Sequence, residues 1–226
     1  MPTIGDENVH CIAIEGSFDD CQSIVKGAFN DLDFKAEFDL GAVNSVNWAR
    51  VMAQIVYYVY AALRFDEPVT FSVPTGNFGN IFAGYLAKRM GAPIEQLILA
   101  TNENDILERF FRSGIYERGE VHHTVSPSMD IQVASNFERF MFLCMDRDPQ
   151  RLKGFMETFE QKGCASLGNL AAVDRSIVAE RVDTDETLAT IRSVYRDHGY
   201  VIDPHSAVGV AAARRRGSST PIAVSY

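Results

Sequence analysis

The feature that most constrains the fold of this chain is a loop with two glycines and two asparagines, Val73-Pro74-Thr75-Gly76-Asn77-Phe78-Gly79-Asn80. The run that leads into the loop, residues 69–73, is β-branched and aromatic, which predicts a buried strand. The apolar residues after the loop recur at helical spacing as far as Met90, which predicts a helix. We therefore expect the loop at a strand-to-helix junction.

A junction of this kind can bind an anion. The first backbone N–H groups of a helix have no intrahelical partner, and the helix dipole favours negative charge, so a phosphate is the natural guest. Gly76 and Gly79 allow close approach of the backbone, and Asn77 and Asn80 can donate side-chain amides. The alternative is a turn that only reverses the chain. The loop matches neither the dinucleotide motif G-x-G-x-x-G nor the P-loop, which ends in Gly-Lys-Ser/Thr.

The overall charge of the chain limits its partners. The 226 residues carry a net charge of −9 and are 46% hydrophobic, as in an ordinary soluble protein. This charge argues against a nucleic-acid or membrane surface, so we expect a small-molecule or protein partner. The four cysteines form no C-x-x-C pair, and with five scattered histidines they predict no metal site. No apolar run is long enough to span a bilayer and no signal peptide is recognisable, which predicts a cytoplasmic protein.

The order of the expected elements indicates an α/β fold with a parallel sheet and flanking helices. The apolar run 8–14 predicts a strand, the following segment to Asn30 a helix, and the charged segment 31–40 an irregular surface that includes Lys35. After the central loop and its helix, residues 96–101 predict a strand that forms a right-handed parallel crossover with the strand over residues 69–73. We expect three parts: an α/β portion over 1–130, a mainly helical insertion over 131–198 with few strands, and a return to the α/β domain over 199–226.

A second possible anion site precedes the helix that begins near residue 48. Asn44 or Ser45 is the expected N-cap of this helix, and Arg50 on its first turn can bind an oxyanion with two hydrogen bonds. The alternative is a capped helix with a surface arginine. Two further polar clusters occur near expected helix starts. Residues 102–105 follow a strand, where they could bind a ligand or cap a helix, and Asp203-Pro204-His205-Ser206 is expected to join a short strand to a helix.

Five motifs in a common order make the chain closely resemble the threonine synthase family, whose members are fold-type-II pyridoxal-phosphate enzymes of the tryptophan-synthase-β-like fold. The similarity covers nearly the whole sequence. Its carriers are Asn44-Ser45-Val46-Asn47-Trp48-Ala49-Arg50, Val73-Pro74-Thr75-Gly76-Asn77-Phe78-Gly79-Asn80, Ala100-Thr101-Asn102-Glu103-Asn104-Asp105, Ser126-Pro127-Ser128-Met129-Asp130 and Asp203-Pro204-His205-Ser206-Ala207-Val208-Gly209.

The resemblance implies a lyase of threonine biosynthesis that converts O-phospho-L-homoserine and water to L-threonine and phosphate, with pyridoxal 5′-phosphate as electron sink. It implies that the cofactor phosphate is held by Gly76, Asn77, Phe78, Gly79 and Asn80. It also implies that Asn44, Ser45 and Arg50 bind the substrate phosphate. Ser206 matches the hydroxyl that faces the pyridine nitrogen, although the family often has threonine there.

The chain departs from the family in one important respect. The family's Schiff-base lysine, in a Phe-Lys-Asp context, lies upstream of the first motif found here, so no catalytic lysine is expected in this sequence. Lys35 follows a phenylalanine, but its acidic neighbours fit a surface turn. We therefore expect a central and C-terminal portion of the enzyme that is inactive alone.

Two alternatives to this interpretation remain. One is another fold-type-II activity, such as a serine/threonine dehydratase, which has no need of a second phosphate grip. The other is a non-catalytic fragment that binds phosphate compounds.

Overall fold

The structure of the protein is a computed structural model that describes residues 6–16, 18–42, 45, 47–168, 173–217 and 222–224. The chain divides into two units, Met1–Gly41 and Ala42–Tyr226. Within the described residues no helix is both long and apolar enough to cross a membrane.

The first unit consists of two helices, α1 (Phe18–Asn30) and α2 (Leu32–Glu37). The predicted helix that ends at Asn30 is confirmed. The expected irregular segment 31–40 is wrong, because Asp31 caps α2 by accepting a hydrogen bond from the backbone N–H of Phe34 at 3.0 Å. Lys35 lies on this short helix and is exposed, as expected.

The predicted strand over residues 8–14 is also wrong. The described part of the segment forms no regular element, and the side chain of Ile12 is 85% exposed. A strand exists only through hydrogen bonds to a neighbouring strand, and the sheets in the described residues include none from this segment. An apolar run by itself therefore does not establish a strand.

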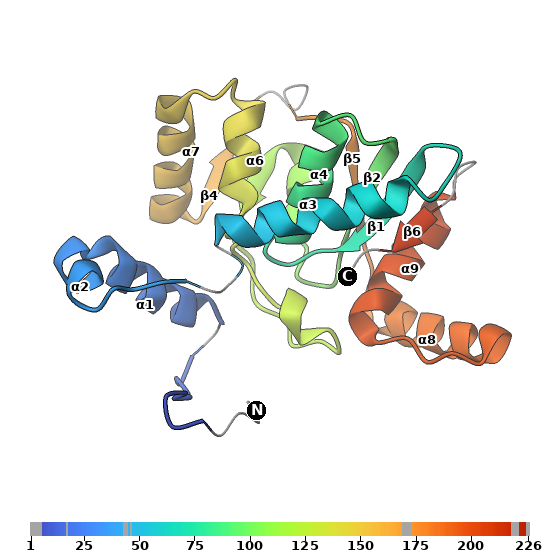
Figure 1. Ribbon diagram of the computed structural model, residues 1–226, viewed down its shortest axis with the longest axis horizontal. Coiled ribbons are helices and arrows are strands. Elements are labelled where there is room, and N and C mark those ends of the chain that lie inside the picture. The colour runs from blue at the N-terminus through green and yellow to red at the C-terminus, as the bar shows by residue number, and fades with distance from the viewer. Residues whose placement is uncertain are drawn as a thin grey trace. The chain divides into compact units, whose positions relative to one another are not determined.

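The second unit is built on a parallel sheet in the order β5-β2-β1-β6 (Figure 1). The predicted strands are confirmed as β1 (Val69–Pro74), which is buried throughout, and β2 (Ile94–Thr101). The C-terminal strand is confirmed as β6 (Ile222–Val224). β5 (Ile177–Arg181) was not predicted, because it lies in the segment 131–198 that was expected to be mainly helical. The α/β fold with a parallel sheet is confirmed.

Helices cover both faces of this sheet (Figure 1). Alternate residues of β2 separate two cores: Leu97 and Leu99 pack with α3–α7, and Ile98 and Ala100 pack with α9. The helices of this unit are α3 (Trp48–Ala62), α4 (Gly79–Arg89), α5 (Ile106–Ser113), α6 (Phe137–Cys144), α7 (Pro149–Lys162), α8 (Thr184–His198) and α9 (Pro204–Arg216). Their positions agree with the helices expected from the sequence.

Smaller elements complete the second unit. A two-stranded antiparallel sheet pairs β3 (Ile115–Glu117) with β4 (Cys164–Ser166), and a short 3-10 helix, η1 (Pro127–Met129), follows β3. The short strand expected just before Asp203 is absent, because residues 200–203 are described as irregular backbone.

The helix α3 begins at Trp48, near the expected residue, but its N-cap differs from the one expected. Its N-cap is Asn47, whose side chain accepts a hydrogen bond from the backbone N–H of Ala49 at 2.9 Å. The expectation that Asn44 or Ser45 caps the helix is therefore wrong. Asn47 has the same capping chemistry as Asn44 and lies one turn nearer the apolar run. The sequence pattern alone therefore does not decide which residue is the N-cap.

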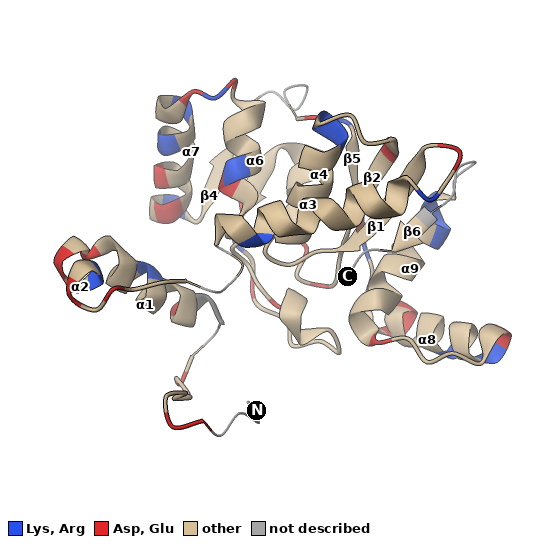
Figure 2. Cartoon of the chain, viewed as in Figure 1, with Lys and Arg blue, Asp and Glu red and all other residues tan. Residues whose placement is uncertain are grey.

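Helices α3 and α4 approach closely at Gly84. A Cβ atom at this position would lie 2.5 Å from Cε1 and 2.7 Å from Cζ of Tyr58, a ring that is fully buried. The hydroxyl of Tyr58 in turn donates a hydrogen bond to Oδ1 of Asn80 at 2.8 Å. The absence of a side chain at Gly84 thus lets a tyrosine reach from α3 to the central loop. Figure 2 shows that α3 is almost free of charged residues.

We predict that Gly84→Ala destabilises the protein by about 1–3 kcal/mol, because the buried ring of Tyr58 must move to admit the methyl group. The matched control is Gly154→Ala in α7, where nothing lies within 4 Å of the added Cβ. This control should stabilise by roughly 0.5–1 kcal/mol through helix propensity. Urea unfolding followed by circular dichroism measures both, and equal midpoints for the two variants would refute the packing argument.

Candidate functional site

The central loop lies where the sequence placed it, between β1 and α4 at the carboxyl end of the parallel sheet. The backbone N–H of Thr75 extends the sheet ladder to the carbonyl of Ala100 at 2.8 Å. Phe78 is the N-cap of α4, and its backbone is left-handed with φ 63°. Because phenylalanine has no capping group, the side chain at the cap leaves the first-turn N–H groups of α4 available to a guest.

The left-handed conformation of Phe78 is held by its ring. The side chain is 1% exposed and packs with Phe82, Phe111, Phe137 and Phe140 at centroid distances of 5.3–6.5 Å. A non-glycine residue in this region costs on the order of 1 kcal/mol or more, and it persists where the surroundings enforce it. The aromatic cluster enforces it here.

A pocket of about 140 Å³ opens at the first turn of α4. It is lined by Ser45, Arg50, Val51, Gln54, Pro74, Thr75, Gly76, Asn77, Phe78, Gly79, Asn80 and Ile81. The structure thus brings together the two motifs that the sequence singled out, since Ser45 and Arg50 line the same pocket as the central loop. Asn44 lies outside the described residues.

The chemistry of the pocket wall suits a phosphate. Among the described lining residues, Arg50 alone carries a charge, and this charge is positive. Gln54 also lines the pocket, one turn from Arg50, and its Oε1 is buried with no hydrogen-bond partner among the described residues. Rotation of this amide by 180° would present its NH₂ group instead, so Gln54 can serve as a donor to an anion. The sequence analysis missed Gln54, whose only signal was its place one turn beyond Arg50.

The pocket is too small for a whole cofactor. One water needs roughly 10–15 Å³ by this measure, whereas sites for entire small molecules occupy about 300–1,000 Å³. The residues present therefore fit the phosphate end of pyridoxal phosphate, or a substrate phosphate. None of the described lining residues is a lysine.

Asn136 holds the loop from one side, a role of which the sequence shows little sign. Its side chain is fully buried, and its Nδ2 donates to the carbonyls of Ser45 at 2.9 Å and Asn77 at 3.1 Å. Its backbone N–H also donates to Asn77 O at 3.0 Å. Asn136 precedes α6, so the sequence indicates a helix cap, but its side chain makes no capping bond and joins the two predicted phosphate motifs instead.

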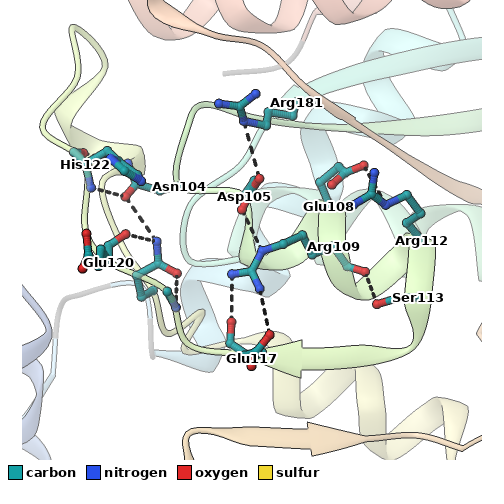
Figure 3. Close-up of polar contacts among 12 residues, drawn as sticks. Asn104, Asp105, Glu108, Arg109, Arg112, Ser113, Glu117, Glu120, His122 and Arg181 are labelled. Atoms are coloured by element: carbon teal, nitrogen blue, oxygen red, sulfur yellow. Dashed lines mark hydrogen bonds and ion pairs between the residues drawn. The ribbon is translucent and has the colours of Figure 1, made fainter.

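The cluster over residues 102–105 makes no side-chain cap for α5 and does not line the pocket, but Glu103 accepts a hydrogen bond from the backbone N–H of Thr184 at the start of α8 at 2.7 Å. Asn102 and Asn104 are buried and donate to Oδ1 of Asp130 at 2.7 and 3.0 Å. Asn104 also exchanges two hydrogen bonds of 2.9 Å with the backbone of His122 (Figure 3). These amides therefore hold the long loop that precedes η1.

Asp105 in the same cluster is the N-cap residue of α5, but its side chain forms ion pairs instead of a capping hydrogen bond. Its carboxylate contacts Nε of Arg109 at 2.8 Å and Nε of Arg181 at 3.5 Å (Figure 3). Arg181 is the last residue of β5, and Arg109 lies on α5. The carboxylate of Asp105 therefore links β5, which the sequence did not predict, to α5, which it did.

Ser206 lies on the first turn of α9 and does not line the pocket in the described structure. Asp203 caps this helix and accepts hydrogen bonds from the backbone N–H groups of His205 and Ser206 and from the Ser206 hydroxyl. Burial raises the pKa of Asp203, but these hydrogen bonds outweigh it, so the pKa lies below its usual range. The hydroxyl proton of Ser206 is thus directed at Asp203, and its oxygen can accept a further hydrogen bond.

Comparison with known proteins supports the same family. The family of pyridoxal-phosphate dependent enzymes matches residues 3–222. Threonine synthase of Pseudomonas aeruginosa is 49% identical over 98% of this chain, and the match covers 49% of that protein. The chain spans about half the length of the curated relatives that it matches.

Solved structures agree with the sequence relatives. The crystal structure of pyridoxal-phosphate-bound threonine synthase from Brucella melitensis is 54% identical, with a TM-score of 0.87, over 97% of this chain and 49% of that one. Maize serine racemase, at 16% identity and a TM-score of 0.61 over 96% of this chain and 58% of its own, shares the fold. The resemblance drawn from the sequence motifs is therefore confirmed, and the chain belongs to the family of pyridoxal-phosphate dependent enzymes.

Proposed function

We propose that this chain carries the phosphate-binding half of a threonine synthase, which converts O-phospho-L-homoserine and water to L-threonine and phosphate. The observation that carries the proposal is the shared pocket, where Ser45 and Arg50 face the same space as the glycine loop. A dehydratase acting on serine has no substrate phosphate to bind and no need of this second set. A cytoplasmic location stays a prediction.

In the proposed reaction, bound pyridoxal phosphate supplies an electron sink for carbanions. The chain's own residues bind and orient the phosphate groups. The backbone N–H groups at residues 76–80 and the α4 dipole hold the cofactor phosphate, and Arg50 with Ser45 binds the substrate phosphate. A guanidinium suits this second task because it donates to phosphate in a bidentate geometry and stays charged as phosphate leaves. By the family resemblance, the Ser206 hydroxyl would face the pyridine nitrogen of the bound cofactor.

We predict that Arg50→Ala weakens binding of inorganic phosphate to the chain by about tenfold, because one charge-assisted hydrogen bond contributes roughly 1.5 kcal/mol. Arg50→Lys should recover part of the loss, since it keeps the charge without the planar fork. Arg192→Ala is the control, because this exposed arginine lies on α8 and does not line the pocket. Isothermal titration calorimetry measures the affinities. Equal affinity for wild type and Arg50→Ala would place the anion elsewhere.

We predict that O-phospho-L-homoserine competes with inorganic phosphate for the pocket, whereas L-serine does not. The reason is that Arg50 and Ser45 recognise the phosphate group, which serine lacks. Displacement of phosphate, followed by ³¹P NMR line widths, reports the competition. Displacement by L-serine at similar concentration would instead support a dehydratase-like activity.

We predict that turnover needs the half of a full-length threonine synthase that this chain does not cover. Along α3, Met52, Val56, Tyr60 and Leu63 are each 48–68% exposed at helical spacing, an apolar face that a further part of the enzyme would cover. Co-expression with the unmatched half of the Pseudomonas aeruginosa enzyme should yield threonine and phosphate from O-phospho-L-homoserine, and Arg50→Ala should reduce that yield. Threonine formation by this chain alone would show that a catalytic lysine lies within it.

A further inference from the structure

The turn Ser126–Asp130 lies directly against the central loop. A Cβ atom at Gly76 would lie 2.8 Å from the carbonyl oxygen of Ser128 and 3.3 Å from Cα of Met129. The backbones of the two segments are therefore in contact, and only glycine fits between them. The position of the turn decides where Gly76, and the N–H groups that follow it, can lie.

One end of this turn is fixed by the carboxylate of Asp130. Its Oδ1 accepts from Asn102, from Asn104 and from the hydroxyl of Thr124 at 2.7–3.0 Å, and its Oδ2 accepts from the backbone N–H of Thr124 at 2.8 Å. Four hydrogen bonds on one carboxylate leave that end of the turn little freedom.

The middle of the turn is held by His205, which lies on α9. Nε2 of His205 is 2.8 Å from Oγ of Ser128, and the backbone N–H of Ser128 points to the same nitrogen at 3.3 Å. Nδ1 of His205 is 3.2 Å from Oδ1 of Asp203, and the imidazole side chain is only 13% exposed.

The protonation of this imidazole follows from its partners. A backbone N–H can only donate, so Nε2 must present a lone pair to Ser128. The ring proton of neutral histidine then resides on Nδ1, where it is donated to Asp203. The same carboxylate also accepts the hydroxyl of Ser206, so one acidic group orients both His205 and Ser206.

We propose that His205, as the neutral Nδ1–H tautomer, is a positioning residue that links the Ser206 turn of α9 to the turn supporting Gly76. Through this link the two ends of the expected cofactor site, the phosphate loop and the serine opposite the ring nitrogen, keep a set separation. The consequence for the cofactor site rests on the proposed function, whereas the contacts of His205 involve only residues of this chain.

The order Ser128–His205–Asp203 is also that of a hydrolytic triad. The two arrangements differ at the serine backbone. In serine hydrolases a backbone N–H beside the nucleophile stabilises the developing oxyanion, whereas the N–H of Ser128 is directed at the imidazole. We therefore assign Ser128 as a held hydroxyl and not as a nucleophile.

The tautomer is tested on the wild-type chain by ¹⁵N NMR of its histidine rings near neutral pH. We expect the Nδ1 resonance of His205 to be that of a protonated nitrogen and Nε2 that of a bare one. The opposite pattern, or a doubly protonated ring, would overturn the proposal, and so would stable labelling of Ser128 by a fluorophosphonate probe.

The link itself is tested with His205→Ala, His205→Gln and Ser128→Ala, followed by amide hydrogen exchange. Both alanine substitutions remove the contact between Nε2 of His205 and Oγ of Ser128, so exchange in residues 126–130 and 76–80 should speed up by at least about five- to tenfold. His205→Gln should restore most of the protection, because its amide oxygen can reach the Ser128 N–H. The control is His198→Ala, an exposed histidine at the end of α8, which should leave both segments unchanged. Unchanged exchange in His205→Ala would refute the link.

Binding of pyridoxal phosphate to the same variants separates the two proposals. If the wild-type chain binds it, we expect several-fold weaker binding for His205→Ala and recovery in His205→Gln. If the wild-type chain fails to bind either pyridoxal phosphate or inorganic phosphate, the proposed function fails, whereas the tautomer and the exchange data still decide the role of His205. Equal cofactor affinity in wild type and His205→Ala would contradict the positioning role.

Discussion

The left-handed backbone of Phe78 is the constraint on which the site depends. At φ 63° this residue turns the chain from β1 into α4 and exposes the first-turn N–H groups of the helix. The strain is on the order of 1–3 kcal/mol, whereas removal of a buried phenylalanine ring costs about 3–5 kcal/mol. Burial of the ring among four other aromatic rings therefore outweighs the strain, and the core behind the loop sets the shape of the loop.

Groups from distant parts of the second unit surround this loop on several sides. Tyr58 reaches Asn80 from α3, Asn136 joins Asn77 to Ser45, and the turn that carries Ser128 abuts Gly76. Each contact uses a different element, so the loop is fixed as in a preorganised anion site, where donors must be in place before the guest arrives. Rigid placement of donors suits a phosphate guest.

The pocket, the family and the length of the chain are mutually consistent. The pocket has one positive side chain among its described lining residues, and the relatives named above include threonine synthases roughly twice as long as this chain. The proposed phosphate-binding half, with its apolar face on α3, is what a larger enzyme of this kind would contain. The proposed function and the proposed role of His205 both follow from the geometry at the carboxyl end of the same sheet.

The sequence alone predicted the central loop, β1, β2 and most of the helices of the second unit, because hydrophobic period and glycine placement are local properties of the chain. It also led to the correct family. The loop and Arg50, which the sequence indicated as two anion sites, line one pocket in the structure. Prediction from the sequence failed for the run 8–14, for β5 and for the roles of Asn136 and His205. A strand needs a partner, and these two side chains act on residues 59–91 and 77 positions away. Contacts of that range leave no periodic signal, so only the tertiary structure decided them.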